Sequence, residues 1–179
     1  MKNPEWIAKS VEMVAQMMAI AAVTAPKAKG ENFVAVKVLQ GAVLQELSQA
    51  MIAYGESAHK ANFDRDGKNV ANSDAVVLIG LEKPNTVGLN CGACGFPTCA
   101  DLLAQQPVEG EFCGPICAYR LLDMGIALGS AVKTASLMNV DNRIMYRIGT
   151  AARQMGLVDW EFVMGVPLSV SGKSIYFDR

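Results

Sequence analysis

All five cysteines of this 179-residue chain lie between positions 91 and 117. Cys91, Cys94 and Cys99 form a C-x2-C-x4-C run, and a glycine follows each of the first two cysteines. Glycine tolerates positive φ angles and adds no side chain, so such a loop can turn several thiolates toward one inorganic centre. Disulfide frameworks are instead typical of short, cysteine-dense secreted chains. The pattern therefore favours a metal or iron–sulfur site over inert or paired thiols.

The spacing also bears on which centre the cysteines hold. Iron–sulfur clusters usually take four thiolates, and the fourth must come from Cys113 or Cys117. Structural zinc sites typically use two separate C-x2-C pairs, so the uneven x2, x4 run is less suited to zinc. The run also differs from the bacterial and plant-type ferredoxin spacings. The residues alone leave the fourth ligand open between these two cysteines.

Length and composition limit the class of protein. A chain of 179 residues suits one domain, and a net charge of -1 gives no basic field for nucleic acid. Hydrophobic residues make up 51% of the chain, but charged residues interrupt the apolar stretches, so we expect no membrane-spanning segment. Without a recognisable signal peptide, a cytoplasmic location is expected. The excess apolar surface predicts an oligomer, because a subunit interface would bury it.

Hydrophobic periodicity predicts an α+β order. Helices are predicted from Pro4 to Thr24, from Gly41 to about Gly55, over one or two turns at 98–105, over 116–137 with Pro115 in the first turn, and from an Asp141 cap to Gly156. The 116–137 helix is apolar on most sides and is predicted to be the most buried. Strands are predicted at 33–39, 75–80, 160–166 and 174–177. The polar stretch 56–72 has no clear period and is predicted to form a loop.

The run Cys91-Gly-Ala-Cys94-Gly-Phe-Pro-Thr-Cys99 resembles the CGxCGxPxC loop of corrinoid iron–sulfur proteins and of the ferredoxin-like subunit of membrane electron-transport complexes. In those proteins the loop binds a 4Fe-4S cluster that a more distant cysteine completes. Seventeen residues separate Cys99 from Cys117 and thirteen separate it from Cys113, and the longer separation matches the family better. The resemblance therefore implies Cys91, Cys94, Cys99 and Cys117 as the metal ligands, with Cys113 a spare thiol.

The whole chain, 1–179, resembles the uncharacterised ferredoxin-domain-containing proteins of anaerobic bacteria and archaea. The likeness is carried by the 25–30 loop and by the segments 73–80, 114–117, 122–129 and 165–173. More distantly, the order of elements is similar to that of flavin-dependent nitroreductases. This implies an α+β, nitroreductase-like single domain with a central sheet, a long buried helix and an inserted iron–sulfur segment at 85–120.

Nitroreductases are homodimers that bind FMN at the dimer interface, so the same resemblance implies a homodimer and an FMN site. Lys27 and Lys29 stand where those enzymes carry an Arg-x-Ser-x-Arg segment, and Ser171 and Lys173 follow the last long strand. Two lysines can bind a phosphate as point charges but lack the bidentate geometry of arginine. These four residues are therefore candidates for FMN binding.

Three function classes follow from these observations. The first is a 4Fe-4S redox protein that transfers electrons to or from a flavin or a partner protein. The second is a binding or sensing module in which zinc or a cluster only staples the loop. The third is a flavin- or cluster-dependent oxidoreductase in which the cluster binds substrate at an open iron.

Overall fold

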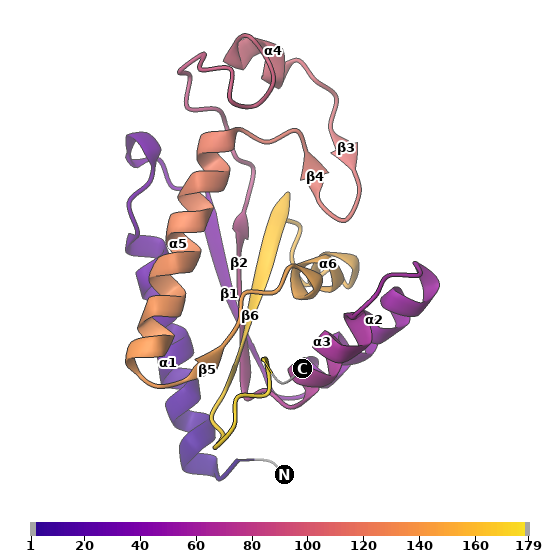
Figure 1. The fold of residues 1–179 in the computed structure, drawn as a ribbon. Helices are drawn as coiled ribbons and strands as arrows, with labels where there is room; N and C mark the ends of the chain where they lie inside the picture. Colours follow the sequence, from indigo (N-terminus) through magenta and orange to yellow (C-terminus); the bar gives the residue numbers. More distant parts are fainter. Residues whose placement is uncertain (1–2, 178–179) are drawn as a thin grey trace.

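The computed structural model describes residues 3–177, which fold around a four-stranded antiparallel sheet (Figure 1). The strand order is β1 (Val34–Gln40), β2 (Ala75–Leu81), β6 (Phe162–Ser169) and β5 (Asp141–Asn142). In this register Leu81 lies opposite both Val34 and Phe162. The start of β1, the end of β2 and the start of β6 therefore meet at one end of the sheet.

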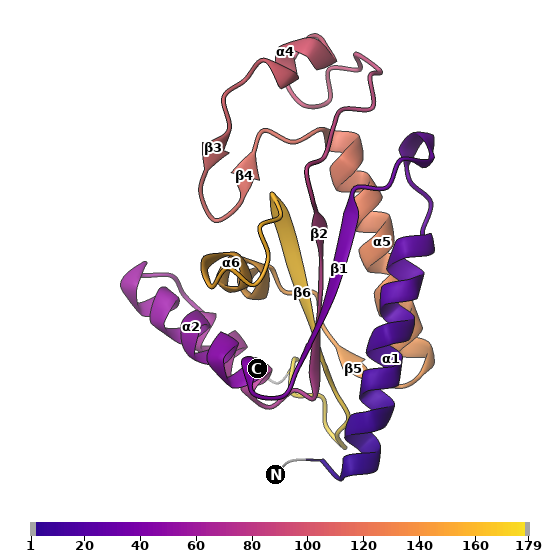
Figure 2. The ribbon, with the colours of Figure 1, turned by 180° about the vertical axis from the view of Figure 1, so that it is seen from behind.

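Helices cover both faces of the sheet. α1 (Glu5–Thr24) and α5 (Ala118–Leu137) lie on one face, and α2 (Val43–Ser57), α3 (Phe63–Ala71) and α6 (Tyr146–Gln154) lie on the other (Figures 1 and 2). Successive side chains of a strand point to opposite faces, so Val77 and Ile79 enter one apolar core while Val76 and Leu78 enter the other. All seven residues of β2 are buried, which confirms the predicted strand with two covered faces.

The predicted loop at 56–72 is wrong, because α3 occupies residues 63–71. Its buried residues Phe63, Asp66, Gly67 and Val70 follow helical spacing. Asp66 is buried in ion pairs with Arg65 and Arg147. A Cβ on Gly67 would lie 2.9 Å from the carbonyl oxygen of Ser48, so the glycine allows α2 to approach closely. An acid and a glycine on the buried face hid the periodicity of this helix.

Four further predictions differ from the structure. The long helix begins at Ala118, so Pro115 precedes it, and it is not the most buried helix because Leu122 and Leu137 are exposed. Asp141 lies in the short strand β5, and α6 begins later, with Met145 as its N-cap. Residues 174–177 form turns instead of the predicted strand.

By length and composition, α1 is long and apolar enough to cross a membrane, although Lys9 and Glu12 lie within it. In the fold its buried stripe, which includes Val11, Ala15 and Met18, packs against the sheet and α5. A core helix of a globular domain has the same properties. The expectation of no membrane segment stays a prediction.

The segment between β2 and α5 projects beyond the end of the sheet at which Leu81 lies (Figures 1 and 2). It contains α4 (Cys99–Leu103), which agrees with the helical turns predicted there, and a small hairpin of β3 (Val108–Glu109) and β4 (Cys113–Gly114). A short 3-10 turn, η1 (Ala28–Gly30), follows α1 and reaches the same end of the molecule. The cysteines and the basic loop thus lie at one end of the sheet.

Candidate metal centre

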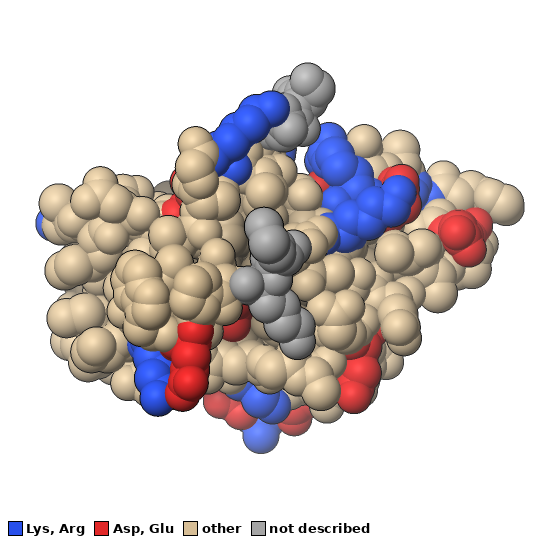
Figure 3. All heavy atoms as spheres, turned by 90° about the horizontal axis from the view of Figure 1, so that it is seen from below, with Lys and Arg blue, Asp and Glu red and all other residues tan. Residues whose placement is uncertain are grey.

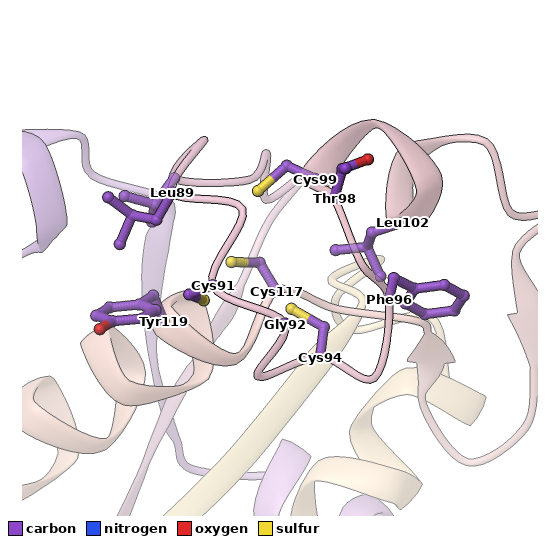
Figure 4. A pocket seen from close by; sticks show the side chains of 11 residues that line it. Leu89, Cys91, Gly92, Cys94, Phe96, Thr98, Cys99, Leu102, Cys117 and Tyr119 are labelled. Carbon is purple, nitrogen blue, oxygen red and sulfur yellow. The ribbon is translucent and has the colours of Figure 1, made fainter.

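Four cysteines line one small hollow at this end of the molecule (Figure 4). Cys91 and Cys94 come from the turn after β2, Cys99 is the first residue of α4, and Cys117 immediately precedes α5. Cys117 is buried, whereas Cys91 is exposed. Apolar side chains complete the wall: Val87, Leu89, Phe96, Leu102 and Tyr119. Four thiols therefore face one hollow whose wall is otherwise mostly apolar.

The two glycines of the run give this loop its shape. Gly92 and Gly95 have φ angles of 73° and 85°, in the region that only glycine adopts readily. No heavy atom lies within 4 Å of a Cβ built on Gly95, so the requirement there is the backbone angle and not the space. The expectation that glycine supplies positive φ in this loop is confirmed.

Backbone N–H groups point at two of the sulfur atoms. Asn90 donates its N–H to Cys99 Sγ and Ala118 donates its N–H to Cys94 Sγ, both at 3.4 Å. The Asn90 bond is the largest cause of a lowered pKa of Cys99, and N–H groups of neighbouring residues add to it. Ala118 is also the first residue of α5, whose N-terminus favours negative charge. At Cys99 the loop thus favours the thiolate over the thiol.

A capping box positions Cys99. Thr98 accepts the N–H of Asp101 through its hydroxyl, and the Asp101 carboxylate accepts the N–H of Thr98 at 3.0 Å. Asn90 closes the loop from the other side, since its side-chain oxygen accepts the N–H of Cys99 at 2.8 Å. These bonds fix the start of α4 and therefore the direction of the Cys99 side chain.

Cys113 does not line the hollow. It lines a neighbouring cavity with Lys83 and Glu161, and Cys117 forms part of the wall between the two. Burial first, and then a hydrogen bond to Glu109, raise the pKa of the Cys113 thiol. The structure thus groups Cys117, and not Cys113, with the first three cysteines.

The four thiols bear on the kind of metal centre. Within residues 3–177, no set of three or more His, Cys, Asp or Glu side chains converges tightly enough for a single metal ion. A tetrahedral zinc ion needs its thiolates about 2.3 Å from one point. An iron–sulfur cluster distributes its thiolates over several iron atoms, so they stand farther apart. Four thiols are a donor set that either centre accepts, so the preference for a cluster rests on the uneven spacing of the cysteines in the sequence.

A buried network of ion pairs and hydrogen bonds lies next to the hollow. Arg120 is fully buried and donates hydrogen bonds to the carbonyl oxygens of Asn85 and Ala28, at 3.0 Å and 3.1 Å. It also pairs with Asp123 and with the Glu31 carboxylate. Asp123 in turn accepts the N–H of Ala28 at 2.7 Å. The network joins α5, η1 and the start of the cysteine segment into one support.

Sequence reasoning missed this role of Arg120. The available signal was an arginine three residues after Cys117, at the apolar start of the helix, with Asp123 one turn later on the same face. The structure pairs Asp123 with the Arg120 guanidinium and with the N–H of Ala28.

The four residues considered for FMN lie at opposite ends of the sheet. Lys27 donates to the carbonyl oxygens of Ala22 and Val23, at 2.7 Å and 2.6 Å, and partial burial lowers its pKa. Lys29 is exposed near the cysteine segment. Ser171 and Lys173 follow β6 at its far end, where the Ser171 hydroxyl bonds Lys173 O. The seven residues of β2 span roughly 20 Å between these ends, so one chain does not bring the two pairs together.

Comparisons with known proteins agree with this arrangement. Residues 113–179 match the family described as "Uncharacterized protein containing a ferredoxin domain", and residues 88–111 match the family described as "Putative Fe-S cluster". An uncharacterized protein of Archaeoglobus fulgidus is 45% identical over 171 residues, which cover 96% of this chain and 92% of that protein.

Solved structures of similar shape are nitroreductases. A Desulfitobacterium hafniense nitroreductase with bound FMN has a TM-score of 0.59 at 14% identity, over 90% of this chain and 79% of that one. The FMN-dependent nitroreductase of Mycobacterium smegmatis in complex with NADPH has a TM-score of 0.61 at 11% identity, over 100% of this chain and 84% of that one. At these identities the likeness shows the fold alone, and it confirms the expected α+β, nitroreductase-like architecture.

Proposed function

Because the chain belongs to the family of uncharacterised proteins that contain a ferredoxin domain, we propose that it is an electron-transfer protein whose 4Fe-4S cluster is held by Cys91, Cys94, Cys99 and Cys117. The convergence of these four thiols on one hollow is the observation that carries the proposal. The family matches make it an iron–sulfur protein, while the cluster type, the ligand set and the electron-transfer role belong to the proposal.

The residues of the site have separate tasks in this proposal. The cluster supplies one-electron chemistry when bound. Gly92 and Gly95 turn the loop, and the N–H groups of Asn90 and Ala118 stabilise negative charge on sulfur. The apolar wall, which includes Leu102, limits water at the centre and so strengthens these bonds. The protein thereby sets the reduction potential.

We also propose a homodimer, because the outer faces of α1 and α5 are apolar. On α1 the exposed apolar side chains are Trp6, Met13, Met17, Ile20 and Val23, and on α5 they include Leu122, Ile126 and Leu137. From below, the side of the molecule formed by these helices carries few charged residues (Figure 3). Burying this face in a second copy would remove a large apolar surface from water.

The electron partners proposed are a flavin or a partner protein. Two fold neighbours are described with FMN. In one chain Lys27 and Lys29 lie far from Ser171 and Lys173, so a shared FMN site would need residues of both subunits. The flavin proposal therefore depends on the dimer.

Anaerobic purification with iron, sulfide, zinc and flavin analysis tests the cluster proposal. We expect about four iron and four sulfide per chain. Serine at Cys91, Cys94, Cys99 or Cys117 removes a thiolate ligand, so each variant should lose most of its iron. Cys113→Ser is the matched control and should keep it.

Two outcomes would contradict the proposal. A colourless wild-type protein loaded with zinc would favour the binding or sensing module with a structural metal. Full iron in Cys117→Ser together with loss of iron in Cys113→Ser would overturn the assignment of the fourth ligand.

A further inference from the structure

The Lys29 side chain reaches the backbone of the cysteine-bearing segment. A Cβ built on Gly88 would lie 3.6 Å from the Lys29 ammonium nitrogen. Gly88 comes three residues before Cys91, and its backbone is one of the groups that lower the pKa of Cys99. The ammonium group therefore lies against the backbone of the segment that leads into the cysteine run.

Hydrogen bonds hold the backbone next to Lys29 in place. Both polar groups of the Ala28 backbone are bonded: its N–H to the Asp123 carboxylate at 2.7 Å and its carbonyl oxygen to Arg120 at 3.1 Å. Arg120 and Asp123 are both buried on α5. Lys29 itself has a φ of 57°, a left-handed conformation that turns the chain at this point. The element that carries Cys117 thus also anchors the lysine.

Lys29 also contributes a charge that its surroundings do not cancel. None of the ion pairs between described residues includes Lys29. Arg120, the other nearby cation, faces two carboxylates, Asp123 and Glu31. Lys27 directs its ammonium group at the last carbonyls of α1. Lys29 is therefore the lysine of this loop whose charge acts on the cysteine segment.

We infer that Lys29 raises the reduction potential of the cluster bound by the four cysteines, an inference that rests on the function proposed above. Reduction adds one electron and hence one negative charge to the site, and no bond forms or breaks. A fixed positive charge nearby stabilises the reduced form more than the oxidised form. Because Lys29 is exposed, salt screens part of this effect.

A redox titration of the anaerobically prepared protein tests the inference. The cluster is reduced stepwise with dithionite through mediator dyes and followed by electron paramagnetic resonance in the wild type, Lys29→Gln, Lys29→Arg and Lys133→Gln. Lys133→Gln removes the same charge from an exposed position on α5, sixteen residues after Cys117 and so roughly 24 Å away along the helix. Iron content is measured for each variant.

We expect Lys29→Gln to keep its iron and to lower the reduction equilibrium constant about tenfold, which is a fall of about 59 mV for one electron. Lys29→Arg and Lys133→Gln should stay at the wild-type potential, and added salt should narrow the gap. An unchanged potential in Lys29→Gln, or an equal shift in Lys133→Gln, would overturn the inference. Loss of iron in Lys29→Gln alone would do so too, because the lysine would then hold the loop. A wild type without iron would refute the proposed function itself.

Discussion

At the residue scale, the sequence predicted the centre because its signals are local. Cysteine spacing and the glycines between them determine how one loop can turn, so Gly92, Gly95 and the three nearest thiols could be interpreted without the fold. The choice between Cys113 and Cys117 could not, since it depends on which way the chain returns to α5. The role of Arg120 depends on carbonyl groups far away in the sequence, and no local pattern announces it.

Gly95→Ala should weaken the cluster site without affecting the rest of the molecule. The φ of 85° costs an alanine about 1–2 kcal/mol, which corresponds to roughly a 5–30-fold loss in equilibrium terms. Iron retention against a chelator is the measurement, and it should fall by a factor in that range.

Gly129→Ala is the control for this substitution. It lies in α5, also has nothing within 4 Å of the added Cβ, and has no positive φ. Alanine there should keep iron at the wild-type level and stabilise the fold by up to about 1 kcal/mol. If both variants retained iron equally, the φ requirement at Gly95 would be refuted.

At the scale of elements, strong hydrophobic periodicity was sufficient to predict a helix or a strand, and weak periodicity was not. The helices α1 and α2 and the strands β1, β2 and β6 lie where their apolar patterns placed them, within a few residues. α3 was missed because its buried face includes Asp66, whose charge is neutralised by arginines from its own helix and from α6. A helix of this kind is formed by its tertiary partners, which a single sequence does not reveal.

The contact between α6 and β6 is the tightest of those that involve a helix glycine. A Cβ on Gly149 would lie 1.8 Å from the carbonyl oxygen of Val163, so α6 would have to move away from the sheet. Gly149→Ala should therefore lower the free energy of unfolding by about 3 kcal/mol or more in urea denaturation. Gly125→Ala, with open space at the added Cβ, should not destabilise. A Gly149→Ala protein as stable as the wild type would contradict this packing.

At the scale of the whole molecule, composition indicated an apolar surplus and the fold shows where it lies. The surplus is concentrated on the outer faces of α1 and α5, including Met13, Met17 and Ile126. Composition could not locate it, because a buried apolar residue and an exposed one look alike in a sequence. The same uncertainty made the long helix appear more buried than it is.

Met17→Glu should convert the proposed dimer to a monomer. Met17 is 45% exposed on α1, and a carboxylate there would lose its hydration in a subunit interface. Gln49→Glu adds the same charge at an exposed position on α2, which covers the opposite face of the sheet, and is the control for charge alone. Light scattering at micromolar concentration should give a dimer for the wild type and the control. A monomeric wild type would remove the dimer and the flavin site that depends on it.

Cys117 differs from the other three cysteines in belonging to the framework of the domain. It is buried immediately before α5, whereas Cys91, Cys94 and Cys99 lie on the projecting segment. A bound centre would therefore link the projecting segment to the start of α5 and reduce the number of conformations that the segment can adopt. Binding of the centre should slow amide hydrogen exchange in the projecting segment and leave amide exchange in the sheet unchanged. We therefore expect loading of the centre to order the projecting segment and to leave the sheet unchanged.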